Sequence, residues 1–147
     1  MSEIMGIDCV LARNSGSYVS PTWNTITIAR DVSLNMERKA GDTSKRGGGG
    51  HASELVGNSD TGVEFEVIYD PTDTQFIALQ AAYMAKTIVE FAVSNGVIAT
   101  PGTNYLRAHF QIHKFSRTEP LDDASKVSCM IKVAPNASAT PAFTTTP

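Results

Sequence analysis

Three histidines are the residues of this sequence best suited to bind a metal ion or transfer a proton: His51, His109 and His113. His109 and His113 lie four residues apart in a segment that alternates like a β-strand, which separates them by about 13 Å. Zinc ligands lie within about 2.3 Å of one ion, so these two side chains cannot bind the same ion directly. We therefore predict no metal site and interpret both as part of a solvated strand face.

The two cysteines, Cys9 and Cys129, could act as a nucleophile or form a disulfide. A reactive thiol needs an electropositive, partly open setting, whereas both cysteines occupy apolar positions of alternating segments. No secretion signal follows the first residue, so we expect a cytosolic protein, in which disulfides are rare. The sequence therefore predicts two reduced, packed cysteines.

The run of four glycines from Gly47 to Gly50 is the feature closest to a phosphate-binding loop. A P-loop places a Lys and then a Ser or Thr after its last glycine, at the start of a helix. Here His51, Ala52 and Ser53 follow, without a strand before the run or a helix after it. We therefore predict a flexible loop and no bound cofactor.

The charged clusters indicate no catalytic residue either. Asp122 and Asp123 lie in a predicted turn, and Asp70 and Asp73 lie where a helix begins, so each pair has an ordinary structural role. The basic group within residues 38–46 is interrupted by an aspartate and has no interleaved aromatic residues. A net charge of −3 also argues against a nucleic-acid-binding domain. No run of about 18 apolar residues predicts a membrane span.

The elements that would position these residues are mostly strands. The one clear helix has Asp70 as its N-cap, Pro71 at its first position, and an apolar stripe of Phe76, Leu79 and Tyr83 that should be buried. Period-two alternation predicts the strands. We expect strands at residues 6–12, 23–29, 32–40 and 62–69, a helix at 71–85, and strands at 87–94, 105–117 and 124–134.

Two segments lack such a pattern. Residues 41–61 predict a long projecting loop, because unstructured loops of this length inside a domain are usually functional or disordered. Residues 135–147 are rich in Ala, Thr, Ser and Pro and predict a flexible C-terminal tail. We expect residues 1–147 to form a single domain, mainly β with one α-helix, as a β-sandwich or a rolled sheet with a flanking helix. Such a domain, with no site of its own, is expected to assemble with copies of itself.

Four features together resemble the major tail tube proteins of long-tailed bacteriophages. They are the strand from Trp23 into Arg30-Asp31-Val32, the strand at 33–40 with the glycine-rich loop, the strand–helix–strand order from Phe65 to Phe91, and the closing strands at 110–116 and 126–133. The resemblance covers most of residues 5–134 and depends on the order and spacing of elements. It implies a β-sandwich core with a flanking helix.

The resemblance implies a structural virion protein with no enzymatic activity. Its subunits would form stacked, hexameric rings around a hollow conduit through which DNA passes without specific binding. It would act in the virion tail after assembly in the host cytoplasm, with no membrane contact. Its partners would be copies of itself and tail proteins such as a tape measure, terminator or sheath protein. Two alternatives stay open: another tube or connector component, such as a tail terminator or a type VI secretion-like tube protein, and a non-viral β-sandwich binding module.

Stacked rings need an element that reaches the next ring, and the predicted loop at 41–61 is the candidate. We expect Lys45, Arg46, His51 and Glu54 at this inter-ring interface, with Leu55 docked on the next ring. Ordering a glycine-rich loop costs about 1–2 kcal/mol per residue, so we expect the loop to become ordered only in the assembly.

Overall fold

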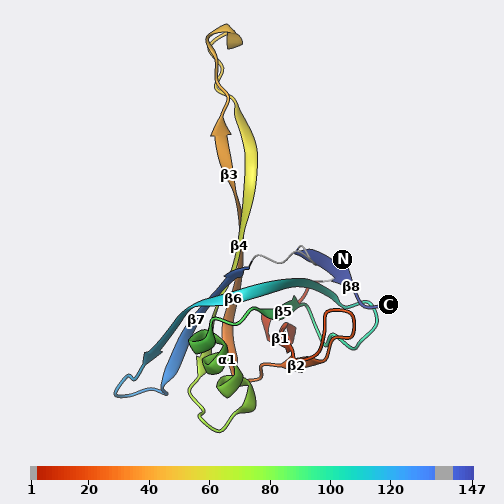
Figure 1. The fold of residues 1–147 in the computed structure, drawn as a ribbon, viewed down its shortest axis with the longest axis vertical. Helices are drawn as coiled ribbons and strands as arrows, with labels where there is room; N and C mark the ends of the chain where they lie inside the picture. The colour runs from red at the N-terminus through yellow and green to blue at the C-terminus, as the bar shows by residue number, and fades with distance from the viewer. Residues whose placement is uncertain (1–2, 135–140) are drawn as a thin grey trace.

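The structure is a computed structural model and describes residues 3–134 and 141–147. Within them the chain forms one α-helix and eight β-strands (Figure 1), which confirms the predicted mainly β class with one helix. The elements in chain order are η1 (Gly6–Asp8), β1 (Val10–Asn14), β2 (Trp23–Thr25), β3 (Ala29–Asp42), η2 (Arg46–Gly48), β4 (Glu54–Ile68), α1 (Thr74–Ala85), β5 (Val89–Ser94), β6 (Asn104–Thr118), β7 (Lys126–Val133) and β8 (Ala142–Thr145).

All eight strands belong to one antiparallel sheet in the order β2-β1-β5-β6-β7-β4-β3, with β8 beside β6. Thr25 pairs with Ala12 near one end of the sheet, and Ala29 pairs with Val67 near the other. The four peptide units between Thr25 and Ala29 span at most about 14 Å, so the two ends must approach each other. The sheet is therefore rolled, which is the second of the two arrangements we expected.

Three strands pair with β6, and the stretches that pair with β5 and β8 overlap at residues 105–107. β5 pairs with residues 105–110, β7 with residues 110–118, and β8 with residues 104–107. The prediction of a flexible tail is therefore wrong for residues 142–145, where β-branched threonines form a short strand despite the lack of apolar alternation. Residues 135–140 of the predicted tail lie outside the described residues.

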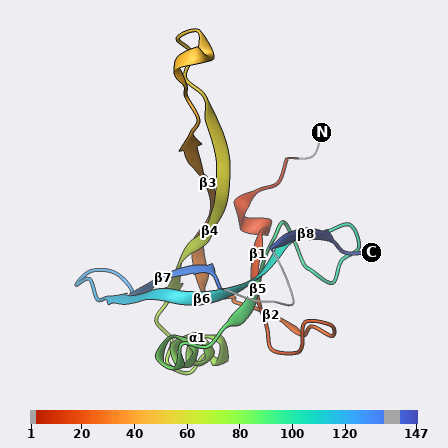
Figure 2. The same ribbon diagram turned by 45° about the horizontal axis from the view of Figure 1, so that its top comes forward.

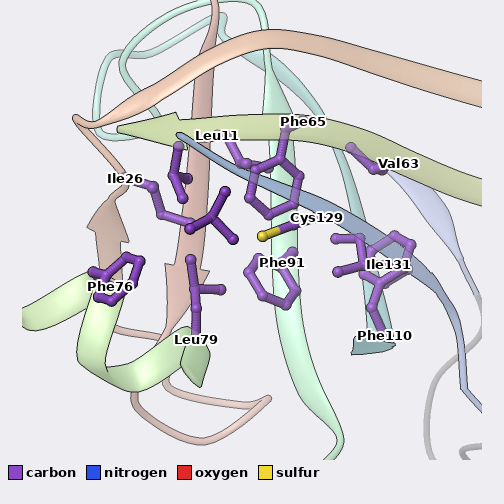
Figure 3. Packing of buried hydrophobic residues seen from close by; sticks show 13 residues of the cluster. Leu11, Ile26, Val63, Phe65, Phe76, Leu79, Phe91, Phe110, Cys129 and Ile131 are labelled. Carbon is purple, nitrogen blue, oxygen red and sulfur yellow. The ribbon is translucent and has the colours of Figure 1, made fainter. Parts of the chain in front are cut away.

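The rolled sheet and α1 enclose one hydrophobic core (Figure 3). Phe91 and Phe110 come from neighbouring strands and pack edge to face, with ring centroids 6.1 Å apart. Leu79 points from α1 into the same cluster and is fully buried. Burial of each such side chain stabilises the fold by about 1.5–3 kcal/mol.

The helix begins three residues later than predicted. Asp73 is its N-cap, since its carboxylate accepts hydrogen bonds from the backbone N–H groups of Gln75 and Phe76 (2.9 and 3.1 Å). Asp70 instead accepts hydrogen bonds from the hydroxyl and backbone N–H of Thr72, which lower the pKa of its carboxyl. Both aspartates satisfy the preference for a short acidic side chain before a helix, and sequence alone could not distinguish them.

The buried stripe of α1 is confirmed at Phe76 and Leu79, which are 2% and 0% exposed. Tyr83 is 40% exposed, so the prediction that it is buried is wrong. Its ring stacks on Phe115 of β6 at a centroid distance of 5.9 Å and covers the edge of the core.

The first predicted strand begins only at Val10, where pairing with β5 starts. The residues before it form η1, which leaves Ile7 89% exposed and Cys9 exposed as well. The predicted packing of Cys9 is therefore wrong, because alternation alone does not supply a partner strand. Cys129 is buried as predicted, and burial raises the pKa of its thiol to about 12.

The largest difference from the sequence prediction concerns residues 41–61. β3 continues to Asp42 and β4 begins at Glu54, so the predicted loop is mostly the end of a long β-hairpin. Backbone hydrogen bonds form this ladder, and neither face of it is buried within the chain. Apolar alternation, the pattern that predicts a strand, has no reason to occur there.

Candidate assembly surfaces

The hairpin of β3 and β4 projects from the rolled sheet as a two-stranded ribbon (Figures 1 and 2). β4 pairs with β7 only from Gly62 onward, whereas its pairing with β3 extends outward to Glu54. We call residues 36–61 the outer ribbon. The β4 side of it is exposed from Glu54 to Asp60. An isolated two-stranded hairpin is at best marginally stable in water, so this ribbon is suited to packing against a partner.

The end of the outer ribbon is a defined turn. Thr43 and Ser53 face each other, with a backbone hydrogen bond of 2.9 Å and a hydroxyl contact of 2.8 Å. Gly49 and Gly50 have φ angles of 67° and 83°, which L-residues with side chains rarely adopt. The four-glycine run therefore has a local structural role, since two of its members provide the left-handed backbone that closes the turn.

A register shift bends the ribbon between Arg38 and Ala40. Gly57 lies opposite this shift, and a Cβ atom there would approach the backbone oxygen of Lys39 to 3.0 Å. The guanidinium of Arg38 donates a hydrogen bond of 3.3 Å to the carbonyl of Gly57. The bulge is thus fixed by a small residue and a side-chain contact, as is common where a strand must change direction.

The five predicted interface residues all lie at or beside the end of the outer ribbon, and all are exposed. Lys45 and Arg46 lie at the start of η2, His51 follows the turn, and Glu54 pairs with Asp42 in the last rung of the ladder. Leu55 is 68% exposed, and its neighbour Val56 is 67% exposed. The structure therefore places these residues in the part of the ribbon that also exposes Leu55 and Val56, whose side chains lie on opposite faces of the strand.

A second exposed apolar surface lies on α1. No charged residue occurs from Thr74 to Ala85. On the side turned away from the core, Ile77 is 50% exposed, Met84 is 74% exposed, and Ile88 just beyond the helix is 40% exposed. We call this surface the outer face of α1. Clustered apolar side chains that a subunit leaves uncovered often mark an interaction surface, so this face is also suited to packing against a partner.

The sheet face turned away from the core is polar. Asp60 and Glu64 of β4 and Lys132 of β7 line a shallow hollow together with Glu37 of β3. Lys132 Nζ lies 4.0 Å from a carboxylate oxygen of Asp60. Acidic and basic groups are thus close neighbours on this face of the sheet, as is typical of a surface in contact with solvent.

Residues 5–137 match the sequence profile of the family described as phage tail tube protein. The match spans most of the chain. This chain belongs to the phage tail tube protein family. A search of curated proteins finds no match.

Solved structures of low sequence identity share the fold of this tail tube protein. A chain from the tail of an empty GTA particle, refined with C6 symmetry, is 17% identical with a TM-score of 0.73, and the match covers 95% of this chain and 98% of that one. The SPP1 tail tube is 12% identical with a TM-score of 0.78, covering 97% and 80%. A chain from a contractile injection system sheath–tube complex is 10% identical with a TM-score of 0.66, covering 97% and 92%.

A buried ion pair that was not predicted from the sequence holds a surface loop of this tail tube protein. Glu90, whose side chain is 3% exposed, accepts hydrogen bonds from Arg107 and from Asn14. Arg107 also donates to the backbone oxygen of Tyr18 and lies 3.9 Å from the centre of its ring. A glutamate inside an otherwise apolar strand was the available signal. The pair fastens the segment between β1 and β2 to the sheet.

The histidines are arranged differently from the prediction. His113 is exposed, as expected for a solvated strand face. His109 is only partly exposed, since it stacks against Tyr18 at a centroid distance of 5.7 Å, and its buried Nδ1 has no hydrogen-bond partner among the described residues. Within residues 3–134 and 141–147, no three His, Cys, Asp or Glu side chains gather to hold a metal ion. In the same ranges no helix has the length and apolar character needed to cross a membrane.

Proposed function

We propose that this chain is the major subunit of a tail tube, in which hexameric rings stack into a hollow conduit. The observation that carries the proposal is the outer ribbon, a two-stranded projection with an exposed apolar pair near its end. A free monomer gains nothing from such a projection, which is an aggregation hazard on its own. In a stack of rings it supplies the contact from one ring to the next, with Lys45, Arg46, His51, Glu54 and Leu55 at the interface.

Ring closure requires two different surfaces on each subunit, because neighbours in a cyclic ring meet head to tail. β3 is an outermost strand of the sheet order, so its far edge is available to pair with a neighbour. Pairing of that edge would continue the sheet from subunit to subunit. The six-fold number is taken from the C6 symmetry of the GTA tail that shares this fold.

The polar sheet face is suited to the wall of the conduit. Proteins bind DNA phosphates mainly through Lys and Arg, and affinity rises with the number of such contacts. On this face Lys132 has Asp60 beside it and Glu64 nearby. A wall of neighbouring opposite charges would let DNA pass without holding it.

The tube would lie in the virion tail after its subunits assemble in the host cytoplasm. At its ends and along its length it would meet other tail proteins, namely a tape measure, terminator or sheath protein. These partners come from the family resemblance and from a neighbour in fold that belongs to a sheath–tube complex.

Negative-stain electron microscopy of the purified chain over a range of concentrations tests the proposal. We expect rings with a central hole and, at high concentration, tubes of constant diameter. A chain that stays monomeric at millimolar concentration, by light scattering and microscopy, would rule the proposal out.

A further inference from the structure

The outer ribbon and the outer face of α1 lie at opposite ends of the molecule. β4 runs for 15 residues from the end of the ribbon to the base of the sheet, and α1 begins six residues after it. At about 3.3 Å per residue, this strand alone spans about 50 Å. Figures 1 and 2 both place the ribbon end at the top and α1 at the bottom. A ribbon end therefore cannot reach the helix of its own chain.

Copies stacked in the direction of the ribbon bring these two ends together. In a head-to-tail stack, the surface that leaves one subunit meets the opposite end of the next. Here that opposite end carries α1 and the segment that leads into it. We propose that the end of the outer ribbon in one ring docks on the outer face of α1 in the next ring.

The apolar groups of the two surfaces match in kind. The ribbon end presents Leu55 on one of its faces and Val56 on the other, because successive strand side chains alternate, and the outer face of α1 presents Ile77, Met84 and Ile88. All five side chains are 40–74% exposed in the free subunit. Docking would remove apolar area from water on both sides, which is favourable by about 25 cal/mol per Å². Met84 is unbranched and adaptable, so it can fit against the branched side chains of the ribbon.

The charges around these groups also match. The ribbon end carries Lys45 and Arg46 on its turn and Glu54 at the start of β4. Asp70, which is partly exposed, lies in the segment before α1, and the exposed Lys86 follows the helix directly. A basic turn would meet the acidic start of the helix, and Glu54 would meet Lys86. Exposed pairs of this kind add little affinity, but they orient the two surfaces.

This inference rests on the proposed function, and paired cysteines test it in assembled tubes. The starting variant is Cys9→Ser, which leaves only the buried Cys129. Leu55→Cys and Met84→Cys are then introduced together, and the assembled protein is oxidised and run on a non-reducing gel. Each subunit carries both cysteines, so disulfides between successive rings should join many subunits. The gel should then show a series of bands that extends well beyond the mass of six subunits. The control variant carries Leu55→Cys with Leu121→Cys instead of Met84→Cys. Leu121 is 98% exposed in the turn between β6 and β7, and we expect the control protein to run as a monomer on the non-reducing gel.

The outcomes separate this inference from the proposed function. Tubes that show no ladder with the Leu55–Met84 pair, or the same ladder with the control pair, would overturn the docking site and leave the tube proposal standing. Absence of tubes in the wild-type chain would overturn the proposed function itself.

A single substitution provides a second measurement. Met84→Lys places a charge on the outer face of α1 without touching the core, so the isolated subunit should melt within about 2 °C of wild type. Rings should persist and the number of tubes should fall at least tenfold, while Leu121→Lys should leave tube growth unchanged. Normal tube growth with Met84→Lys would mean that α1 is free to meet another neighbour or another protein, and would contradict the inference.

Discussion

The rolled core and the outer ribbon are both antiparallel β structure, and they differ in what covers their side chains. In the core, β4 lies between β3 and β7, and Val63, Phe65 and Val67 on its inner face are at most 2% exposed. In the outer ribbon, the same strand pairs only with β3, and its residues from Glu54 to Asp60 are exposed. One strand thus has two environments: its inner part is buried in the core of the subunit, and its outer part, from Glu54 to Asp60, is not covered within the chain.

The two sides of α1 differ in the same way, since one is covered and the other is not. Phe76 and Leu79 are buried against the sheet, while Ile77 and Met84 lie open on the other side of the helix. Substitutions on covered surfaces should change folding, whereas substitutions on uncovered apolar surfaces should change assembly.

Removing the outer ribbon should have the largest effect. Arg38 and Ser59 are paired, so an Asn-Gly turn can replace residues 39–58 between them. We expect tube growth to be abolished while the β-type circular dichroism spectrum persists, because the removed segment buries little within the chain. Long tubes from this variant would mean that the ribbon is not the stacking element, and loss of folding would place it in the core.

Breaking the buried ion pair should lower the free energy of unfolding far more than breaking an exposed ion pair. Arg107→Ala leaves the buried Glu90 without a positive charge beside it and with only the hydrogen bond from Asn14, which should lower the free energy of unfolding by about 3–5 kcal/mol. The matched control is Arg117→Ala, whose partner Glu119 is 59% exposed and which should cost at most about 1 kcal/mol. Urea unfolding of both variants measures the difference. Equal losses would show that the segment between β1 and β2 does not depend on the buried pair.

The two sides of α1 should respond differently to truncation. Leu79→Ala should lower the free energy of unfolding by about 2–5 kcal/mol, because it leaves a cavity in the core. Met84→Ala, on the exposed side, should change it by less than about 0.5 kcal/mol. Thermal melting of the two variants in the unassembled state checks this. A stable Leu79→Ala variant would mean that the helix does not pack on the sheet as described.

The smallest expected effect is a difference in reactivity between the two thiols. It does not change the stability of the protein at neutral pH. Cys9 is exposed and should react with a thiol reagent in the native protein, whereas Cys129 should not. Burial raises the pKa of Cys129 to about 12, so its thiolate is scarce until the pH approaches that value. Between the pKa of an unfolded thiol, about 8.5, and 12, only the unfolded state loses this proton, so stability should fall as the pH rises through that window. Mass spectrometry after labelling at pH 8 checks the contrast, and equal labelling of both cysteines would contradict it.

The covered parts of the fold could be predicted from the sequence, since a buried face requires apolar residues at the period of the strand or helix. Phe65, Phe91 and Phe110 lie in alternating segments that became β4, β5 and β6, and Leu79 lies on a helical stripe. The uncovered parts could not, because a ladder held by backbone hydrogen bonds imposes no pattern on exposed side chains. The sequence therefore predicts a loop at residues 41–61, where the outer part of the ribbon lies, and a tail at residues 135–147, where β8 lies.

The candidate site followed the same rule. The five residues proposed for the interface were chosen from their position in the one long segment without a pattern, and the structure places all five at or beside the end of the ribbon. The outer face of α1 was missed, although the lack of any charge from Thr74 to Ala85 was available in the sequence. The pair of Glu90 and Arg107 depends on strands brought together by the sheet, and spacing along the chain does not show it.

Cryo-electron microscopy of tubes assembled from the purified chain tests the central claim most directly. A reconstruction that resolves side chains would show where residues 36–61 lie relative to the boundary between rings. We expect each outer ribbon to cross that boundary, with Leu55 against the next ring. A tube in which every ribbon stays within its own ring, or points into the lumen without touching a neighbour, would contradict the claim that the ribbon joins the rings.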